Sequence, residues 1–266
     1  MSHPNFKYKP LLFSITAKSN LHVGSGGENY GIIDNMIQRD PATNIPCINA
    51  SSIKGALRDF FSHYITEHSE MEKTEYSKME RFIFGNPKKE EDKDPAKQEY
   101  SEGNYKFLQG DLASIPVPQE DVLFKLKTSQ GLINHCAQNL DFLQLNLKTP
   151  PNGEIFGNGC KTIDDTEFIE LISDYKLPVI ARNKLIDGKS DNLWYEQVLP
   201  RETRLYFVVL YPDYTDNTEQ KQYLEIFIEL IEKYPVQIGA NASVGYGYCE
   251  IKCLNNSLKT TDNEAN

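Results

Sequence analysis

Cysteine, tryptophan and long apolar stretches are all scarce in this chain of 266 residues. It contains five cysteines and one tryptophan, and no apolar run approaches the 18 or so residues that a helix needs to cross a bilayer. The N-terminal segment MSHPNFKYKP also lacks the apolar centre of a signal peptide. We therefore expect a cytoplasmic protein that does not span a membrane.

The cysteines are odd in number and scattered along the chain. Cys249 and Cys253 form the one close pair, and in a strand a spacing of four points both side chains to the same face. No second pair of cysteines or histidines stands at the spacing of zinc ligands. The pattern favours two packed thiols over a zinc site.

Basic residues are in deficit, since the formal net charge is -10. Taken alone, this charge argues against nucleic-acid binding, but it is unevenly distributed. Residues 1–65 and 176–204 each carry six lysines and arginines against four acidic residues, whereas residues 66–104 carry eleven acids against seven bases. Because the position of a basic patch matters more than total charge, the composition is compatible with a basic groove.

Apolar residues make up 39% of the chain, with 15 tyrosines and 13 phenylalanines, which is enough for a sizeable core. Strand-like and helix-like patterns alternate irregularly, and long loops separate them. This pattern predicts an α+β domain with a ferredoxin-like (RRM-like) core, in which helices lie on one face of an antiparallel sheet. We expect a single domain over residues 1–254, a charged insertion at 86–104 and a frayed tail at 255–266.

Periodicity locates the main elements. A helix is predicted over about 51–65, with Ser51 or Ser52 as its N-cap, and QGLINHCAQNLDFLQLNL is predicted to form a strand and then a helix. Further strands are expected in LLFSITA, YKFLQGDLASIPVP, KLPVIARN and TRLYFVVLYP, and further helices near 76–84, in DDTEFIELISDY and in TEQKQYLEIFIELIEKY. VQIGANASVGYGYCEIKCL is predicted to be a strand pair interrupted by glycines.

A polar, glycine-rich stretch stands directly before the helix at 51–65. Gly24 and Gly26 permit close approach of another backbone, and Lys54 and Arg58 are four residues apart, so they share one helix face. A helix start with hydroxyls and cations can hold a phosphate group. The alternative is plain capping with two solvated cations.

A second glycine-rich stretch, IGANASVGYGY, follows near the C-terminus. No GxxxxGK[ST] motif occurs, which excludes a P-loop, whereas a bulged hairpin is a simple alternative. Together with the helix start, the two glycine loops indicate a surface across which nucleic-acid backbone lies.

These motifs carry a resemblance to a known family. The segments LHVGSG, IIDNMIQRD, IPCINASSIKGALR, LWYEQVLP and QIGANASVGYGY resemble the RAMP superfamily of CRISPR-associated proteins, from Leu21 to Tyr248. Their order and spacing are most similar to the backbone subunit of type III-B (Cmr) effector complexes.

The resemblance implies a concrete function. Such subunits polymerise along a CRISPR guide RNA, together with other Cmr-type subunits. A thumb-like hairpin interrupts the duplex of guide and complementary target at every sixth nucleotide, and the target RNA is cut there with the help of a divalent metal, Mg²⁺ or Mn²⁺. The essential aspartate of the family corresponds to Asp34, and the thumb falls at about 179–196.

Three residues are predicted to be catalytic: Asp34, His22 and Glu196. Asp34 could bind the metal or accept the proton of the target 2′-OH, and we favour metal binding because a solvated aspartate is a weak base. His22 suits acid–base catalysis by residue type but could equally be structural. Glu196 is predicted to enter the cleavage site of a neighbouring copy.

The predicted RNA-binding residues come from the two glycine loops, the helix start and the thumb. Arg39 could contact a phosphate or pair with an acid, and Trp194 is expected to pack in the core. The full set is Gly24, Ser25, Gly26, Arg39, Ser51, Ser52, Lys54, Arg58, Arg182, Lys184, Lys189, Gly239, Asn241, Gly245 and Gly247.

Two other functions stay open. The chain could bind guide RNA without cutting, or it could be a stand-alone endoribonuclease that processes CRISPR RNA. Asp34 in the matching loop favours cutting, and LWYEQVLP with a single set of glycine loops argues against stand-alone processing.

Overall fold

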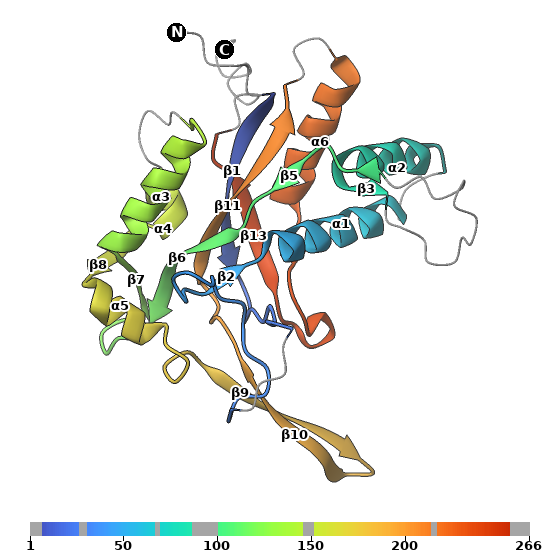
Figure 1. Ribbon diagram of the computed structural model, residues 1–266. Helices are drawn as coiled ribbons and strands as arrows, with labels where there is room; N and C mark the ends of the chain where they lie inside the picture. Colours follow the sequence, from blue (N-terminus) through green and yellow to red (C-terminus); the bar gives the residue numbers. More distant parts are fainter. Residues whose placement is uncertain are drawn as a thin grey trace.

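The computed structural model describes residues 7–26, 31–66, 70–86, 101–145, 152–213 and 217–255. Its strands form a nine-stranded sheet and two small two-stranded sheets (Figure 1). The strands are β1 (Tyr8–Ala17), β2 (Cys47–Ile48), β3 (Gly85–Asn86), β4 (Ser101–Glu102), β5 (Lys106–Phe107), β6 (Gly110–Val117), β7 (Lys125–Ser129), β8 (Lys161–Ile163), β9 (Val179–Ile186), β10 (Lys189–Gln197), β11 (Arg204–Pro212), β12 (Val236–Gln237) and β13 (Tyr248–Cys253). The helices are α1 (Ala50–Thr66), α2 (Glu70–Phe84), α3 (Gln130–Phe142), α4 (Asn152–Phe156), α5 (Asp165–Leu171) and α6 (Thr218–Lys233), with a 3-10 turn at Ala242–Val244.

The large sheet has the strand order β12-β13-β1-β11-β6-β7-β8, with β2 paired to β6 and β5 paired to β11. Its pairings are antiparallel except for β7 with β8. Phe13 in the middle of β1 stands opposite Phe207 of β11 and Cys253 of β13. The predicted α+β class with an antiparallel sheet is confirmed.

Helices cover both faces of this sheet, so the expectation that they lie on one face is wrong. On one face, Phe13 makes an edge contact with Phe227 of α6, and α1 and α2 lie on the same side (Figure 1). On the other face, Asn139 of α3 donates to the Tyr206 hydroxyl. The central strands β1 and β11 read as almost continuous apolar runs because both of their faces are buried.

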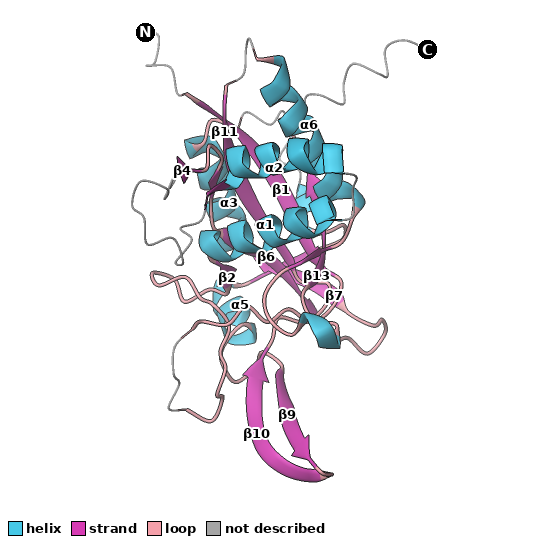
Figure 2. Ribbon diagram, turned by 90° about the vertical axis from the view of Figure 1, so that its right-hand side faces the viewer, coloured by secondary structure: helices cyan, strands magenta, loops and turns pink. Residues whose placement is uncertain are grey.

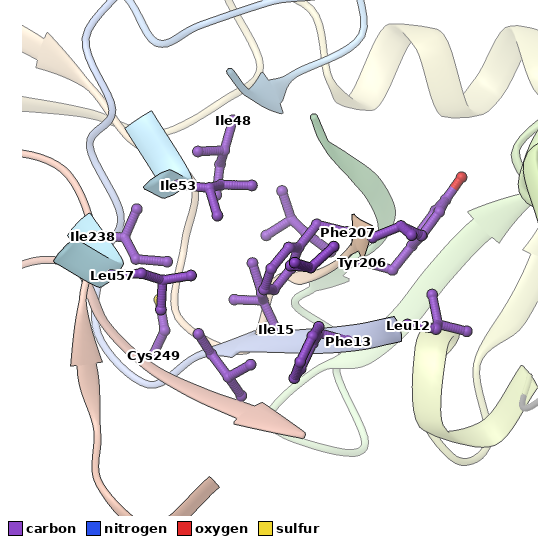
Figure 3. Packing of buried hydrophobic residues seen from close by; sticks show 14 of the residues in the cluster. Leu12, Phe13, Ile15, Ile48, Ile53, Leu57, Tyr206, Phe207, Ile238 and Cys249 are labelled. Atoms are coloured by element: carbon purple, nitrogen blue, oxygen red, sulfur yellow. The ribbon is translucent and has the colours of Figure 1, made fainter. Parts of the chain in front are cut away.

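The core between the sheet and α1 is built from side chains that recur at helical spacing. Ile53 and Leu57 of α1 are fully buried and point toward the strands that carry Phe13 and Phe207 (Figure 3). Phe13 and Phe207 stack with their ring centroids 5.0 Å apart. Burial of each such side chain stabilises the fold by about 1.5–3 kcal/mol. The start of α1 is thereby held firmly against the sheet.

Two predicted element boundaries are wrong. α1 begins at Ala50, so Ser51 and Ser52 lie within its first turn and neither is the N-cap. The amides of Ser52 and Ile53 donate to the carbonyl of Asn49. The QGLINHC part of the next predicted strand belongs to α3, which starts after Ser129, whose side chain caps the helix by accepting from the Leu132 amide. The preceding strand is β7.

A two-stranded hairpin, β9 and β10, projects from the layered body (Figure 2). Arg182 stands opposite Trp194 in its register. Its turn is formed by Asp187 and Gly188, both at positive φ (51° and 76°), as a tight hairpin turn requires. Residues 179–197 are called the hairpin below, and they coincide with the predicted thumb.

Parts of two sequence expectations lie outside the described residues, namely 87–100 of the charged insertion and 256–266 of the tail. Asn255, the first tail residue, is ordered against β1: its side chain accepts from the Leu12 amide at 2.8 Å and donates to the Pro10 carbonyl at 2.9 Å. The prediction of a tail that frays from Asn255 is therefore wrong at that residue. Within the described residues, no helix is both long and apolar enough to cross a membrane.

Candidate functional site

The three residues predicted to be catalytic meet at the base of the hairpin. Consecutive residues of β10 hold them in place. The Tyr195 amide donates to Oδ2 of Asp34 at 2.8 Å, and the Gln197 carbonyl lies 2.7 Å from Nδ1 of His22. Glu196 lies between these two residues. The fold thus gathers side chains that are far apart in sequence.

Asp34 is exposed on a loop that runs along β10 as a short parallel partner. The Asn35 amide donates to the Tyr195 carbonyl at 3.1 Å, and the Gln197 amide donates to the Asn35 carbonyl at 2.9 Å. These bonds anchor the loop to β10 at Asn35, the residue that follows Asp34. Asp34 is therefore both solvent-accessible and fixed relative to the hairpin.

The His22 ring is buried, with 4% of its surface exposed. A carbonyl oxygen can only accept, so Nδ1 carries a proton and donates it to the Gln197 carbonyl. Nε2 lies close to Gly24, because a Cβ atom added to that glycine would stand 3.3 Å from Nε2. The geometry favours the structural reading of His22 over acid–base catalysis.

Glu196 is likewise buried, with 5% of its surface exposed. Its carboxylate accepts hydrogen bonds from side chains of its own chain, among them the half-buried Trp194, whose indole N–H donates at 2.9 Å. This arrangement favours a structural role over the predicted role in a neighbouring copy's cleavage site.

The glycines of the second loop serve two different purposes. Gly239 and Gly247 have positive φ, and a Cβ atom on either would collide with a backbone carbonyl, that of His22 or that of Ile238. Their lack of a side chain is thus required for packing within the protein. Gly245, also at positive φ, faces open space and keeps the predicted role of admitting RNA backbone, as does Gly26 of the first loop.

Gln38 joins the first glycine turn to the start of α1. Its amide nitrogen donates to the Gly24 carbonyl at 3.2 Å and to the Ser52 hydroxyl at 3.0 Å. Its amide oxygen accepts from the Asn49 amide at 2.7 Å. Ser52 therefore contributes to this internal network, whereas Ser51 is exposed. Gln38 was not predicted as a site residue, because in the sequence it is only one polar residue within the segment IIDNMIQRD.

Arg39 pairs with an acid rather than standing free. Its guanidinium lies 2.9 Å from the Asp174 carboxylate and donates to the carbonyls of Asn44 and Ile172, each at 2.8 Å. Burial lowers the pKa of Arg39, and the nearby Asp174 opposes that shift. Of the two predicted uses, the structure supports the ion pair.

A cationic pocket of about 400 Å³ opens beside the start of α1. It is lined by Ser51, Lys54, Arg58 and Lys106, with Phe84, Tyr105 and Phe107 among its other residues. The pKa of Lys54 is lowered by burial and then by the charges of Arg58 and Lys106. Glu102 also lines the pocket and opposes that shift, so three cations stand against one carboxylate and the pocket keeps a net positive charge that favours an external anion. We name this group of residues the cationic pocket.

The cations of this pocket differ in their internal partners. Arg58 donates to Glu80 at 3.2 Å and to the Gly85 carbonyl at 2.9 Å, which fixes its position. Lys106 donates to the Gly103 carbonyl at 3.1 Å and pairs with the Glu102 carboxylate at 3.5 Å. Lys54 forms no ion pair with any residue that the structure describes. Lys106 was missed by sequence reasoning because it lies in a different segment from α1.

The predicted RNA-binding cations of the hairpin divide in a similar way. Arg182 is held at the base, where it lies 3.4 Å from Glu196 and 5.5 Å above the ring of Tyr246. Toward the tip, Lys184 pairs with Asp191 at 2.9 Å, and Lys189 is exposed. The base residues hold the hairpin, whereas the tip offers its charges to solvent.

Within the described residues, no group of three or more His, Cys, Asp or Glu side chains could hold a metal ion. Asp34 is the exposed carboxylate of the predicted site, whereas Glu196 is buried. This donor set fits Mg²⁺ or Mn²⁺ held mainly by water and RNA phosphates, since magnesium commonly uses one or two carboxylates together with substrate phosphates.

Comparison with known proteins places this geometry in a family. A model of the RAMP superfamily matches residues 14–250. The chain is 23% identical to the CRISPR system Cmr endoribonuclease Cmr4 of Pyrococcus furiosus over 91% of its own length and 95% of that protein. A shorter stretch of 57 residues is 42% identical to the CRISPR system Cms endoribonuclease Csm3 of Enterococcus italicus, covering 21% of this chain and 27% of that protein.

Solved structures show the same fold. A chain of the type III-B Cmr-beta complex bound to cognate target RNA superimposes with a TM-score of 0.70 at 18% identity, covering 93% of this chain and 98% of that one. A Cmr4 crystal structure gives a TM-score of 0.62 at 16% identity over 92% and 99%. The chain belongs to the RAMP superfamily.

Proposed function

We propose that this protein is the guide-RNA-binding backbone subunit of a type III-B CRISPR effector complex and that it cleaves complementary target RNA at six-nucleotide intervals. The observation that carries the proposal is the exposed carboxylate of Asp34, which the Tyr195 amide holds at the base of a projecting hairpin. A hairpin that displaces target nucleotides would thereby bring the distorted backbone next to a fixed carboxylate. The likeness to Cmr4 over nearly the whole chain supports the same assignment.

The chemistry requires in-line attack of the target 2′-OH on the adjacent phosphate. The 2′-oxygen loses its proton to water and bonds to phosphorus, which gives a 2′,3′-cyclic phosphate, while the bond to the 5′-oxygen breaks and that oxygen takes up a proton. A nucleotide that is held out of the duplex can reach this geometry, which a regular helix prevents. Asp34 is exposed and well suited to hold a divalent cation. That cation, when bound, supplies charge neutralisation at the phosphate. The hairpin and its anchored loop supply the positioning.

Guide binding is assigned to a separate surface. The cationic pocket offers Lys54 and Lys106 to the phosphates of the guide, and the open turns at Gly26 and Gly245 admit its backbone. Base pairing with the guide selects the target, so the protein itself needs no contacts that read base sequence. The proposed partners are guide RNA, complementary target RNA, further copies of this chain in a filament and other Cmr-type subunits, all in the cytoplasm.

The test is Asp34→Asn in the reconstituted complex. Asparagine keeps an oxygen that can accept from the Tyr195 amide, so the loop should stay docked while the charge is lost. We expect target cutting to fall by about a hundredfold or more, as for the loss of a group acting on the reacting phosphate, with guide binding unchanged.

Asp191→Asn, a change of an exposed carboxylate on the same hairpin, is the matched control and should cut normally. Wild-type cutting by Asp34→Asn with intact guide binding would make the chain a non-catalytic guide-binding subunit. A defined 1:1 complex with a long unstructured RNA, in place of a ladder of multimers, would instead indicate a stand-alone processing enzyme.

A further inference from the structure

Glu196 is a buried carboxylate whose oxygens are occupied by donors from three parts of the chain. Trp194 Nε1 and Asn35 Nδ2 donate to Oε1 at 2.9 and 3.3 Å. Asn241 Nδ2 and Arg182 Nη1 donate to Oε2 at 2.9 and 3.4 Å. The hairpin, the Asp34 loop and the second glycine loop therefore share one carboxylate.

Physical chemistry favours an internal role for such a group. A buried carboxylate is stable only when it is paired and fully hydrogen-bonded, and removal of its charge leaves several donors unsatisfied. Each of its two oxygens already accepts two hydrogen bonds, which fills its ordinary capacity. It therefore has no free position with which to contact an RNA atom.

The backbone around Glu196 connects this carboxylate to Asp34. Tyr195 and Gln197, its two chain neighbours, make the backbone hydrogen bonds that dock Asn35 onto β10. The Tyr195 amide also holds the Asp34 carboxylate. The Asn35 side chain returns to Glu196 itself. Displacement of Glu196 would thus disturb the bonds that join the Asp34 loop to β10.

We propose that Glu196 is a positioning residue, which fixes Asp34 and the second glycine loop to the hairpin base so that cleavage occurs at a set distance from the hairpin. The proposal rests on the proposed function for its consequence in cutting. The docking of the Asp34 loop can be measured in the isolated protein, independently of any cutting.

The first measurement is amide hydrogen exchange of the isolated full chain. Glu196→Gln places an amide NH₂ among groups that donate, which removes acceptors without a change of shape. Exchange at the amides of Asn35, Tyr195 and Gln197 should accelerate by about tenfold or more, since hydrogen bonds to a charged group contribute at least that factor to an opening equilibrium. Asp191→Asn should leave these rates unchanged.

The second measurement is rescue by a compensating substitution. In the double variant Glu196→Gln with Asn241→Asp, the new carboxylate at position 241 can accept from the side-chain amide introduced at position 196 and from Arg182. Asn241 has φ of 67°, a conformation that aspartate also adopts. Asn241→Asp alone sets two carboxylates side by side and should also loosen the loop. The sole tryptophan, Trp194, reports the repair, because its emission should shift in each single variant and return in the double variant.

The third measurement is cutting by the assembled complex. Glu196→Gln should slow cutting by about tenfold or more and spread the cut positions, and the double variant should restore both rate and register. Unchanged amide exchange in Glu196→Gln would overturn the positioning role. Restored exchange and emission without restored cutting, in a complex that binds guide and target RNA as the unsubstituted one does, would also overturn it, because Glu196 would then act on the RNA directly. Absence of cutting by the unsubstituted complex would instead refute the proposed function, and the exchange rates would still decide the docking role.

Discussion

The base of the hairpin and the start of α1 were both predicted from the sequence as RNA-contacting regions, but the fold pairs the charges of the first more completely than those of the cationic pocket beside the second. At the hairpin base, Glu196 and Arg182 are satisfied by partners within the chain. In the cationic pocket, burial and then the charges of Arg58 and Lys106 lower the pKa of Lys54. A satisfied group holds the protein in shape, whereas a crowded set of like charges favours a ligand of opposite charge.

This difference separates positioning from binding. Asp34 belongs to the hairpin base through its bond to the Tyr195 amide, yet its side chain is exposed. The proposed cleavage residue is therefore one of the few groups at the base that can meet RNA. Changes at the base should affect where and how fast RNA is cut, and changes in the pocket should affect how tightly the guide is held.

Metal removal should sharpen the comparison most. We expect EDTA to abolish target cutting and added Mg²⁺ or Mn²⁺ to restore it, because Asp34 is expected to act through a divalent cation. Guide binding should persist in EDTA, since the pocket is proposed to bind phosphate through lysines. The measurement is parallel cleavage and gel-shift assays on one reconstituted complex. Undiminished cutting in EDTA would assign Asp34 a role other than metal binding.

Shortening of the hairpin should have the next largest effect. Arg182 and Trp194 stand opposite each other, so Asn-Gly in place of residues 183–193 gives a tight turn that keeps every partner of Glu196. The chain should stay folded because the removed side chains whose burial the structure describes are exposed. Cuts at six-nucleotide intervals should disappear, which a sequencing gel of end-labelled target RNA would show.

Persistent six-nucleotide spacing in that variant would mean that another element displaces the target nucleotides. The segment PPNGEIFGNGCKT is the sequence-based alternative. Its described part forms α4 and leads into β8, and it buries Ile155 and Phe156 against the sheet. This packing makes it a poorer candidate than the projecting hairpin.

The salt dependence of guide binding should show whether the cationic pocket contacts phosphates. Lys54→Gln with Lys106→Gln should weaken guide binding and flatten the plot of log K against log salt by about 0.7 per lost phosphate contact on single-stranded RNA. Lys125→Gln, at an exposed lysine of β7, is the matched control. An unchanged slope would leave the pocket lysines as a solvated face.

The smallest effect concerns the stability of the isolated protein. Lys54 and Arg58 are a like-charge pair four residues apart on α1, so Lys54→Gln should raise the free energy of unfolding by a few tenths of a kcal/mol, reduced by solvent screening. The folded state holds the Lys54 proton less tightly than the unfolded chain does. Stability should therefore rise as the pH increases through the lowered pKa, and Lys54→Gln should remove this rise. Urea titrations at two pH values would measure both effects.

The sequence predicted the elements with strong periodicity and missed what depends on distant contacts. Apolar runs in the sequence located β1 and β11. The thumb predicted at about 179–196 falls in the projecting hairpin. The boundary of α1 was missed because Ser51 and Ser52 are good caps, yet the chain uses Asn49 and a bond to Gln38. Helices on both sheet faces were missed, although the continuous burial of β1 requires them.

The candidate site shows the same limit. The family resemblance nominated Asp34 and the thumb residue Glu196, residue type nominated His22, and the fold brings the three together. Sequence could not show that Asp174 neutralises Arg39 or that Trp194 donates to Glu196, because these partners depend on the tertiary fold. A basic residue indicates where charge is available, and only the structure shows whether that charge has been used internally.

The most direct test of separate positioning and binding is the single-turnover cleavage rate as a function of guide RNA concentration, compared for Asp34→Asn and for Lys54→Gln with Lys106→Gln. The pocket variant should reach the wild-type rate once guide RNA saturates it, because its chemistry is intact. Asp34→Asn should stay at least about a hundredfold slower at every guide concentration. A wild-type plateau for Asp34→Asn, or a pocket variant that remains slow at saturation, would contradict the account.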